Sequence, residues 1–498
     1  MPTIRQANNL PHCPHKQHGA ALMVMLVIMV MGSAAFLVSS LNRSAVQTER
    51  DRLTADALTQ AKMALISYAA TYAETHIGEV HGYLPCPDEG QSITQDGQAN
   101  GSCGTTDVSR IGKLPWYTLG LQPKDGNGEC LWYAVSGSHK NNPKTQMMND
   151  DTVGLFEVIA PDGANYLAGS NTDNRAVAVI FAPGNAQGGT QSHSSAAGTP
   201  SCGGNYVASN YLDNDTTHNI NNSVVSATAK AVSRFIAGPV RDASDNTIVN
   251  DRVIFITKDD IFNAIRHRAD FVDPARNPLL LMTRKAAECI ADYGRRNSAG
   301  SSDKRLPWSG RPAPAVGTDC SYRDSSASTS PTNVMFGRLP NRVNVSRGNT
   351  TNQITSTSCS GTSSYYQLKS DSTGCPNVPD WSTYYPWWSN WKDHVFYTLS
   401  NSYRPAAGSS PSCGTCLAVN GVGSYAAIVM FAGQKLASQA RSTSSDQINF
   451  SNYLEGSNLI SNTPITTPGN GNYQSGAATS SFNDILFCIQ SDLSVAPC

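Results

Sequence analysis

The feature that most constrains this chain is an uncharged run near its N-terminus. Residues 20–41 are 22 consecutive residues without a charged side chain. A helix rises about 1.5 Å per residue, so this run can cross the roughly 30 Å hydrocarbon core of a bilayer. We therefore expect a membrane-spanning helix at 20–41. The leader before it, residues 1–19, contains Arg5 and Lys16 but no acidic residue.

The helical pattern continues beyond the apolar run. Residues 42–74 contain neither Pro nor Gly, and apolar side chains recur at helical spacing, including Leu53, Ala57, Ala61 and Leu65. The sequence thus predicts one helix of about 55 residues, apolar in its first half and amphipathic in its second. A secretory signal peptide is one alternative, but its apolar core usually spans roughly 7–15 residues and then breaks. An ordinary signal anchor is the other alternative.

The junction between the leader and the apolar run carries a more specific pattern. Gly19 is followed directly by Ala20, the apolar run and then the amphipathic helix, an order that resembles type IV prepilins and type II secretion pseudopilins. In that family a prepilin peptidase cleaves after the glycine on the cytoplasmic side and methylates the new N-terminus. The resemblance implies that Gly19 is the cleavage residue and Ala20 the first mature residue.

The chain departs from this family at one position. Most subunits carry a glutamate at the fifth mature position, where this chain has Val24. A carboxylate inside a bundle of apolar helices needs a partner, which in the family is the amine of the neighbouring subunit. Family members without the glutamate lie at the filament tip. The resemblance therefore implies a minor, tip-type subunit.

Composition and cysteine content favour an exported protein. Only 15% of the residues are charged and the formal net charge is −1, so neither a nucleic-acid partner nor a polybasic membrane patch is indicated. Beyond Cys13 of the leader, an even number of cysteines predicts up to six disulfides in an oxidising compartment. We expect a single pass through the inner membrane, with the C-terminal bulk in the periplasm and later on an extracellular filament. The twelve disulfide candidates are Cys86, Cys103, Cys130, Cys202, Cys289, Cys320, Cys359, Cys375, Cys413, Cys416, Cys488 and Cys498.

Spacing suggests some of the pairings, although the complete connectivity does not follow from sequence. A C-x-x-C pair such as Cys413 and Cys416 could be redox-active in a thioredoxin-like context, or bind zinc if it were doubled. Neither context surrounds this Ser-, Pro- and Gly-rich loop, so we assign the pair a structural role. The other expected pairs are Cys86–Cys103, Cys130–Cys202 and Cys488–Cys498.

Six short strings recur in the same order in the second half of the chain. Such a series predicts two tandem copies of one unit. Short apolar runs between Gly, Pro, Asn and Ser predict strands and long loops, so each copy is expected to be a helix, a cysteine-bearing loop and a sheet. The matched strings are 84–85 and 306–307, 112–115 and 337–340, 132–136 and 396–400, 179–182 and 429–432, 209–213 and 451–455, and 250–251 and 483–484.

These observations predict an α+β protein. A long N-terminal membrane-spanning pilin-type helix is followed by two tandem, disulfide-linked α+β units with mainly antiparallel sheets. The strings at 84–88, 114–121 and 124–136 resemble those of large pilin-like proteins of Gram-negative bacteria. The expected division is leader 1–19, membrane and filament helix 20–41, first unit 42–257, linker 258–276 with a short helix capped by Thr257, and second unit 277–498 with its own helix at 279–296.

An aromatic run is the first candidate binding feature. The eleven residues from 381 to 391 include four tryptophans, Trp381, Trp387, Trp388 and Trp391, and two tyrosines. Exposed on a loop, they would suit a sugar or a partner surface. The alternative is that they fill the core at the edge of the second sheet.

Oxygen-bearing loop residues are the second candidate. Asp125, Asn127, Asp213 and Asp215 could hold calcium, as in some pseudopilins, but their spacing is not that of an EF-hand. Asx turns with local backbone hydrogen bonds are the favoured interpretation. We therefore predict no metal site.

Taken together, the patterns favour a structural function. The chain has no nucleophile elbow, P-loop, dinucleotide fingerprint or zinc-protease motif, so we predict neither an enzyme nor a cofactor. The resemblance implies a minor pilin or pseudopilin-like subunit of a type IV pilus or type II secretion filament. Its partners would be other pilins, the prepilin peptidase, the inner membrane and a surface ligand. A pilus-tip or membrane-anchored adhesin that binds carbohydrate, and a membrane-anchored periplasmic enzyme, are the alternatives. The sequence does not decide between pilus and pseudopilus.

Overall fold

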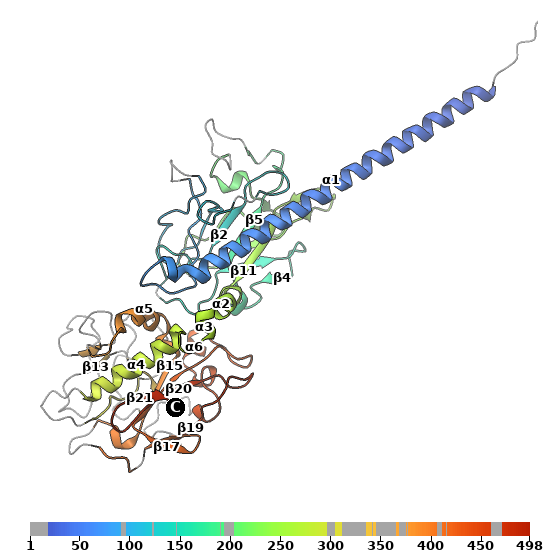
Figure 1. Ribbon diagram of the computed structural model, residues 1–498. Helices are drawn as coiled ribbons and strands as arrows, with labels where there is room; N and C mark the ends of the chain where they lie inside the picture. Colours follow the sequence, from blue (N-terminus) through green and yellow to red (C-terminus); the bar gives the residue numbers. More distant parts are fainter. Residues whose placement is uncertain are drawn as a thin grey trace, which may run out of the picture.

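The protein has an α+β fold with one long helix and two main sheets (Figure 1). The computed structural model describes residues 18–90, 96–121, 124–145, 147–189, 191–193, 204–295, 304–310, 335–340, 342–344, 365–367, 375, 377–405, 411–414, 416–459 and 471–498. For residues 18–28, 32–44, 342–344 and 365–367 it describes the backbone alone.

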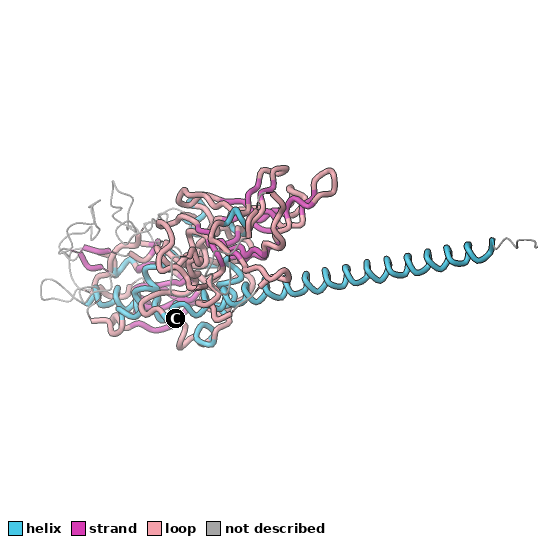
Figure 2. Tube along the Cα trace, turned by 90° about the horizontal axis from the view of Figure 1, so that it is seen from above, coloured by secondary structure: helices cyan, strands magenta, loops and turns pink. Residues whose placement is uncertain are grey.

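Helix α1 (His18–Thr75) runs without interruption through the predicted boundary at residue 41. Its 58 residues give a length of about 87 Å at the usual helical rise. The C-terminal part packs on the globular body, and the N-terminal part projects away from it (Figure 2). The predicted continuous helix is therefore confirmed.

Membrane crossing by this helix stays a prediction. Within the described part of the chain, no helix offers a segment long and apolar enough to span a bilayer. Most side chains of residues 20–41, on which the prediction rests, lie outside the described set, as do those of Gly19, Ala20 and Val24.

The first sheet lies under the C-terminal part of α1 and contains seven strands among the described residues. Five of them follow one another in the order β1-β2-β5-β3-β4. β11 also pairs with β5, and β8 also pairs with β3. All pairings are antiparallel except β3 with β8. Helix α1 contacts β5 and β11. The strands are β1 (Arg110–Lys113), β2 (Trp132–Val135), β3 (Phe156–Ile159), β4 (Tyr166–Ala168), β5 (Ala176–Ala182), β8 (Ser233–Ile236) and β11 (Arg252–Thr257).

The second sheet is entirely antiparallel, with five described strands in the order β12-β15-β18-β20-β21. Helix α4 (Pro278–Arg295) covers it by contacting β18, β20 and β21. The strands are β12 (Phe336–Arg338), β15 (Val395–Leu399), β18 (Ala427–Phe431), β20 (Ile485–Ile489) and β21 (Val495–Pro497). We call this sheet with α4 the second unit, and the first sheet with the C-terminal part of α1 the first unit.

Short elements connect and decorate the two units. α2 (Lys258–Arg266) begins at the predicted cap, because the Thr257 side chain accepts a hydrogen bond from the Asp260 backbone amide. The other helices are α3 (Ala269–Val272), α5 (Trp381–Trp391) and α6 (Ser444–Gln447). The small strands are β6 (Asn214–Asp215) with β7 (Ile220–Asn221), β9 (Val240–Arg241) with β10 (Thr247–Val249), β13 (Arg342–Asn344) with β14 (Tyr365–Gln367), and β16 (Leu417–Val419) with β17 (Val422–Tyr425) and β19 (Asn472–Tyr473).

Four strands of the first unit correspond to four strands of the second. The path β1-β2-β5-β11 in the first corresponds to β12-β15-β18-β20 in the second, antiparallel throughout. In each unit a buried tyrosine of the second strand donates its hydroxyl to the carbonyl of a Leu-Pro string. Tyr133 bonds Pro85 at 3.1 Å, and Tyr397 bonds Pro307 at 3.2 Å. The recurring strings thus lie at equivalent places, while the proposed domain boundaries stay predictions.

Strand register changes one of the string matches by a single residue. The sequence pairs 179–182 with 429–432, which makes Ile180 equivalent to Met430. In the sheets, Tyr133 pairs with Ile180 whereas Tyr397 pairs with Val429. Ile180 and Val429 both face the helix-covered core, whereas Met430 faces the other side of its sheet. A shift of one residue reverses the face of every side chain in a strand, so Val429 is the structural equivalent.

Disulfides lie in both units. Two of the expected pairs, Cys86–Cys103 and Cys488–Cys498, are present. Cys413 pairs with Cys416, and Cys289 of α4 pairs with Cys375. Cys130 is disulfide-bonded as well. Cys202, Cys320 and Cys359 lie outside the described residues.

A glycine on the first unit permits close docking of α1. The Gly126 amide donates to the Thr54 hydroxyl at 2.9 Å, and a Cβ at Gly126 would lie 2.1 Å from the Arg50 carbonyl oxygen. We expect Gly126→Ala to lower the free energy of unfolding by about 1–3 kcal/mol, because the helix backbone must move. Thermal unfolding checks this. Gly101→Ala, where an added Cβ meets nothing within 4 Å, is the control, and equal effects of the two changes would contradict the docking.

Candidate functional site

The candidate site lies where the two units meet. A loop of the first unit, between β2 and β3, contacts the segment around α5 in the second. The Met148 amide donates to Asn390 Oδ1 at 2.7 Å, and Asn149 Nδ2 donates to the Asn390 carbonyl at 2.8 Å. A single apolar cluster continues across the same boundary, from α1 through Met148 to α4 and α5. The units are therefore joined by a packed interface.

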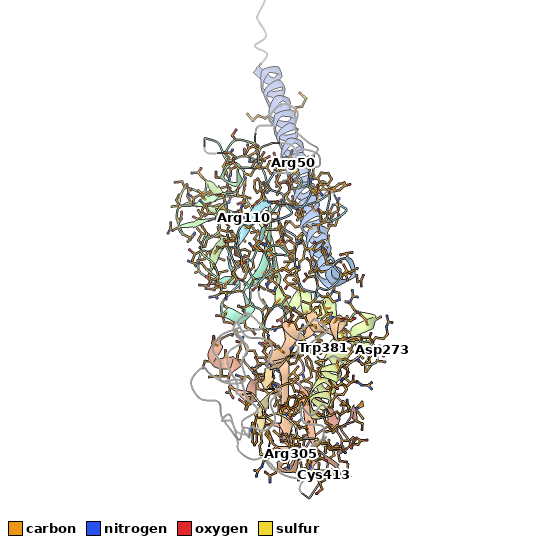
Figure 3. All side chains as sticks on the ribbon, turned by 90° about the vertical axis from the view of Figure 1, so that its left-hand side faces the viewer. Arg50, Arg110, Asp273, Arg305, Trp381 and Cys413 are labelled. Carbon is orange, nitrogen blue, oxygen red and sulfur yellow. A yellow bond between two sulfur atoms is a disulfide. The ribbon has the colours of Figure 1, made fainter. Side chains whose placement is uncertain are left out.

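The aromatic run predicted for binding is a helix in this interface. α5 buries Trp381, Trp388 and Trp391, which are only 3%, 0% and 6% exposed. Figure 3 labels Trp381 near the middle of the molecule, at the level of the interface. The run is therefore not the exposed loop that a binding role would need: positions 381, 388 and 391 share one helical face that packs against α4, in agreement with the alternative that these aromatics fill the core. Pro386 inside the run obscured that periodicity.

Trp387 is the half-buried tryptophan of the run, and it lines a cavity of about 260 Å³. Most of the wall is apolar and comes from α2, α3, α4 and α5, with Phe262, Phe271 and Leu280 as examples. Its polar wall groups include His81, Asp150, Arg266 and Asn277. An apolar pocket with a few polar groups at a boundary between units is a usual location for a ligand.

Beside the cavity, side chains from both units form a buried polar cluster. His394 is fully buried, and its Nε2 lies 3.2 Å from Asp150 Oδ1 and 3.1 Å from Asp151 Oδ2. On the other side of the ring, Nδ1 lies 3.0 Å from Asp393 Oδ1. Tyr453 donates its hydroxyl to Asp151 Oδ2 at 3.3 Å. Among the described residues, Asp150, Asp151 and His394 are the group whose ligand atoms converge within 4.8 Å.

Electrostatics favour positive charge at the centre of this cluster. Burial alone would lower the pKa of His394, but Asp393, Asp151 and Asp150 together raise it well above its ordinary value. Burial would likewise raise the pKa of Asp393, and His394 holds it below its ordinary value. The site is therefore built to hold a cation between carboxylates.

Little in the sequence indicates this cluster. Asp150 and Asp151 precede His394 by more than 240 positions, and no short motif contains all three. The one usable signal is the local pairing of Asp393 with His394, which is common in proteins and does not by itself indicate a site.

The residues proposed for calcium make local hydrogen bonds instead. Asp125 Oδ1 accepts from the backbone amides of Asn127 and Glu129, and Asp125 Oδ2 accepts from the Gly184 amide at 2.9 Å. Asp215 accepts from the Thr217 amide and lies against His218. The contacts of Asp125 with the Asn127 amide and of Asp215 with the Thr217 amide are those of Asx turns, the interpretation that the sequence favoured, whereas the Gly184 contact joins distant segments.

Asp213 belongs to a buried carboxyl pair that occurs in both units. Asp251 Oδ2 accepts from the Asp213 amide at 2.8 Å, and Asp484 Oδ2 accepts from the Glu455 amide at 3.0 Å. An asparagine side chain also bonds each of these aspartates. Burial and the neighbouring Asp213 raise the pKa of Asp251 well above its ordinary value; burial and Glu455 do so for Asp484.

Comparisons with known proteins add no name to these observations. No protein-family model, no curated protein and no solved structure matches the chain. The resemblance to prepilins therefore stays a prediction from the sequence.

The carboxyl pairs predict how stability depends on pH. A raised pKa means that the folded state holds the proton more tightly, so the stabilisation is complete below about pH 4 and is lost as pH rises through the folded pKa. One such group changes the free energy of unfolding by up to about 1.4 kcal/mol per pH unit. Asp251→Asn, which mimics the neutral acid, should therefore raise the melting temperature more at pH 8 than at pH 5, relative to the parent. The exposed Asp259→Asn is the control; a gain independent of pH would contradict the raised pKa.

Proposed function

We propose that this protein is a structural subunit of a filament built by packing N-terminal helices, of the type IV pilus or type II secretion kind. It would enter the inner membrane through residues 20–41, be cleaved after Gly19, and occupy the filament tip. Prepilin peptidase and other pilins would be its partners.

The observation that carries this proposal is the uncovered apolar part of α1. Met29, Val30 and Met31 are 69%, 57% and 60% exposed. Three consecutive helical residues point in directions about 100° apart, so apolar side chains face outward around most of the helix. Large apolar side chains exposed in this way need lipid or other helices as their surroundings. The membrane would supply lipid before assembly, and the filament would supply neighbouring helices afterwards.

The arrangement of the body supports a position at the tip. The projecting part of α1 lies at one end of the molecule and the second unit at the other, with Cys413 labelled near the far end (Figure 3). A filament that contains the helix would therefore display the second unit outward. Val24 in place of the family's glutamate agrees with a subunit that has no other subunit ahead of it in the filament.

Processing of the N-terminus tests this proposal. We expect protein extracted from its native membrane to begin at N-methylated Ala20, and Gly19→Arg to leave the leader attached. Mass spectrometry of the N-terminal peptide measures both. Gly32→Ala, inside the apolar run, is the control and should be processed normally. An intact Met1, or cleavage near Ser39 and Ser40, would overturn the filament proposal.

The cavity at the boundary between the units favours a second function, adhesion. Its aromatic walls and its polar groups suit a sugar or a similar amphipathic ligand. We expect Trp387→Ala to weaken binding to the target surface at least tenfold without unfolding, because Trp387 is the partly buried tryptophan of the run and lines the cavity. A cell-binding assay measures it, with the exposed Tyr117→Ala of the first unit as control. Equal binding by the Trp387 variant and the parent would exclude this role.

A further inference from the structure

We propose that Asp150, Asp151 and His394 bind one divalent transition-metal ion, with Zn²⁺ as the leading candidate, and that this ion joins the two units. The inference does not depend on the filament proposal, because it rests on the interface between the units alone.

The positions of the three groups fit a shared ion. Their ligand atoms lie within 4.8 Å of one another, and His394 Nε2 is 3.2 and 3.1 Å from one oxygen of each aspartate. Zinc binds imidazole nitrogen and carboxylate oxygen at about 2.0–2.2 Å, which places neighbouring ligands of a tetrahedron about 3.3–3.6 Å apart. The two separations from His394 lie just below this range, so the imidazole and the carboxylates must move slightly apart to admit the ion.

Unsatisfied atoms at the same place form an independent observation. His394 Nε2, Asp150 Oδ1 and Asp151 Oδ1 are buried and make no hydrogen bond of acceptable geometry. Buried polar atoms are almost always hydrogen-bonded or bound to an ion, because burying them unpaired costs free energy. A proton on Nε2 could point at only one of the two aspartates, whereas a metal ion interacts with all three groups at once.

The groups around the ligands orient them for metal binding. Asp393 can only accept a hydrogen bond when ionised, so in the neutral imidazole that metal binding requires, the contact at 3.0 Å would hold the proton on Nδ1 and leave the Nε2 lone pair for the ion. A carboxylate behind a metal-binding histidine is the usual supporting arrangement at zinc sites. Asn149 Nδ2 donates to the same Asp393 oxygen at 3.3 Å, and the Tyr453 hydroxyl steadies Asp151.

The donor set selects the class of metal. One imidazole and two carboxylates suit Zn²⁺ or Mn²⁺, whereas Ca²⁺ and Mg²⁺ prefer sites made of oxygen alone. Three protein ligands leave a position for water. Asp150 also lines the cavity, which provides a path for the ion and for water.

Bound metal would join segments far apart in the chain. Asp150 and Asp151 lie in the loop between β2 and β3, and His394 lies directly before β15. The ion would therefore fix the second unit relative to the first, in addition to the hydrogen bonds that Asn390 accepts from Met148 and Asn149.

Metal titration of the full chain in detergent tests the proposal. After removal of metal with a chelator, we expect Zn²⁺ to rebind at one ion per chain, measured by elemental mass spectrometry after dialysis, and to raise the melting temperature. Ca²⁺ should do neither. Asp150→Asn and Asp151→Asn should each weaken Zn²⁺ binding at least tenfold, and Asp393→Asn by about 10–100-fold.

The controls separate this site from other histidines. His193→Gln removes a ring that lies 3.1 Å from Glu129 but outside the convergent group, and should leave Zn²⁺ binding unchanged. Asp150→Asn keeps the shape of the side chain, so it tests the site even if His394→Gln does not fold. Absence of bound Zn²⁺ in the parent would overturn the proposal. It would indicate that protonated His394 itself forms ion pairs with the two aspartates. Binding that persists in both aspartate variants would also overturn it, and would assign the metal elsewhere, such as His12, His15 and His18 of the leader.

Discussion

Burial of one apolar sheet face beneath a single helix is the interaction on which the rest of this structure depends. α1 provides the cover for β5 and β11, and α4 provides it for β18 and β20. The cover in the first unit is much longer than the sheet beneath it. Its C-terminal part is therefore fixed by packing, while its N-terminal part projects beyond the globular body (Figure 2). The helix that completes the first unit thus also carries the exposed apolar residues on which the filament proposal rests.

The helix that covers the second sheet is much shorter, because α4 has 18 residues against the 58 of α1. What distinguishes the second unit is α5, which buries three tryptophans against α4 and contacts residues beyond the second unit through Trp387 and Trp391. The apolar cluster therefore continues from one unit into the next. Charged groups buried beside it, His394 above all, are costly unless they are paired. Their presence specifies one relative position of the units more strictly than apolar packing alone.

Elsewhere the two units repeat the same kinds of polar contact with different residues. Lys113 of the first and Arg338 of the second follow the matching glycine, and each places its cation over the aromatic ring of a buried tyrosine. Lys113 Nζ is 5.6 Å from the ring centre of Tyr211, and Arg338 Cζ is 5.0 Å from that of Tyr453. The buried carboxyl pairs are repeated as well. These polar contacts hold the loops against the sheets in both units, whereas the convergent group of two aspartates and a histidine occurs, among the described residues, at the interface.

Local patterns in the sequence determined the long helix, the Thr257 cap, the recurrence of matched strings and two disulfides. Helical periodicity, capping and short-range pairing depend on residues that are near one another in the chain. Only the tertiary structure decided that the aromatic run is a buried helix, that Val429 rather than Met430 corresponds to Ile180, and that two aspartates meet a histidine more than 240 positions away. Those outcomes depend on which faces of distant elements come into contact, and neither spacing nor composition encodes that choice locally.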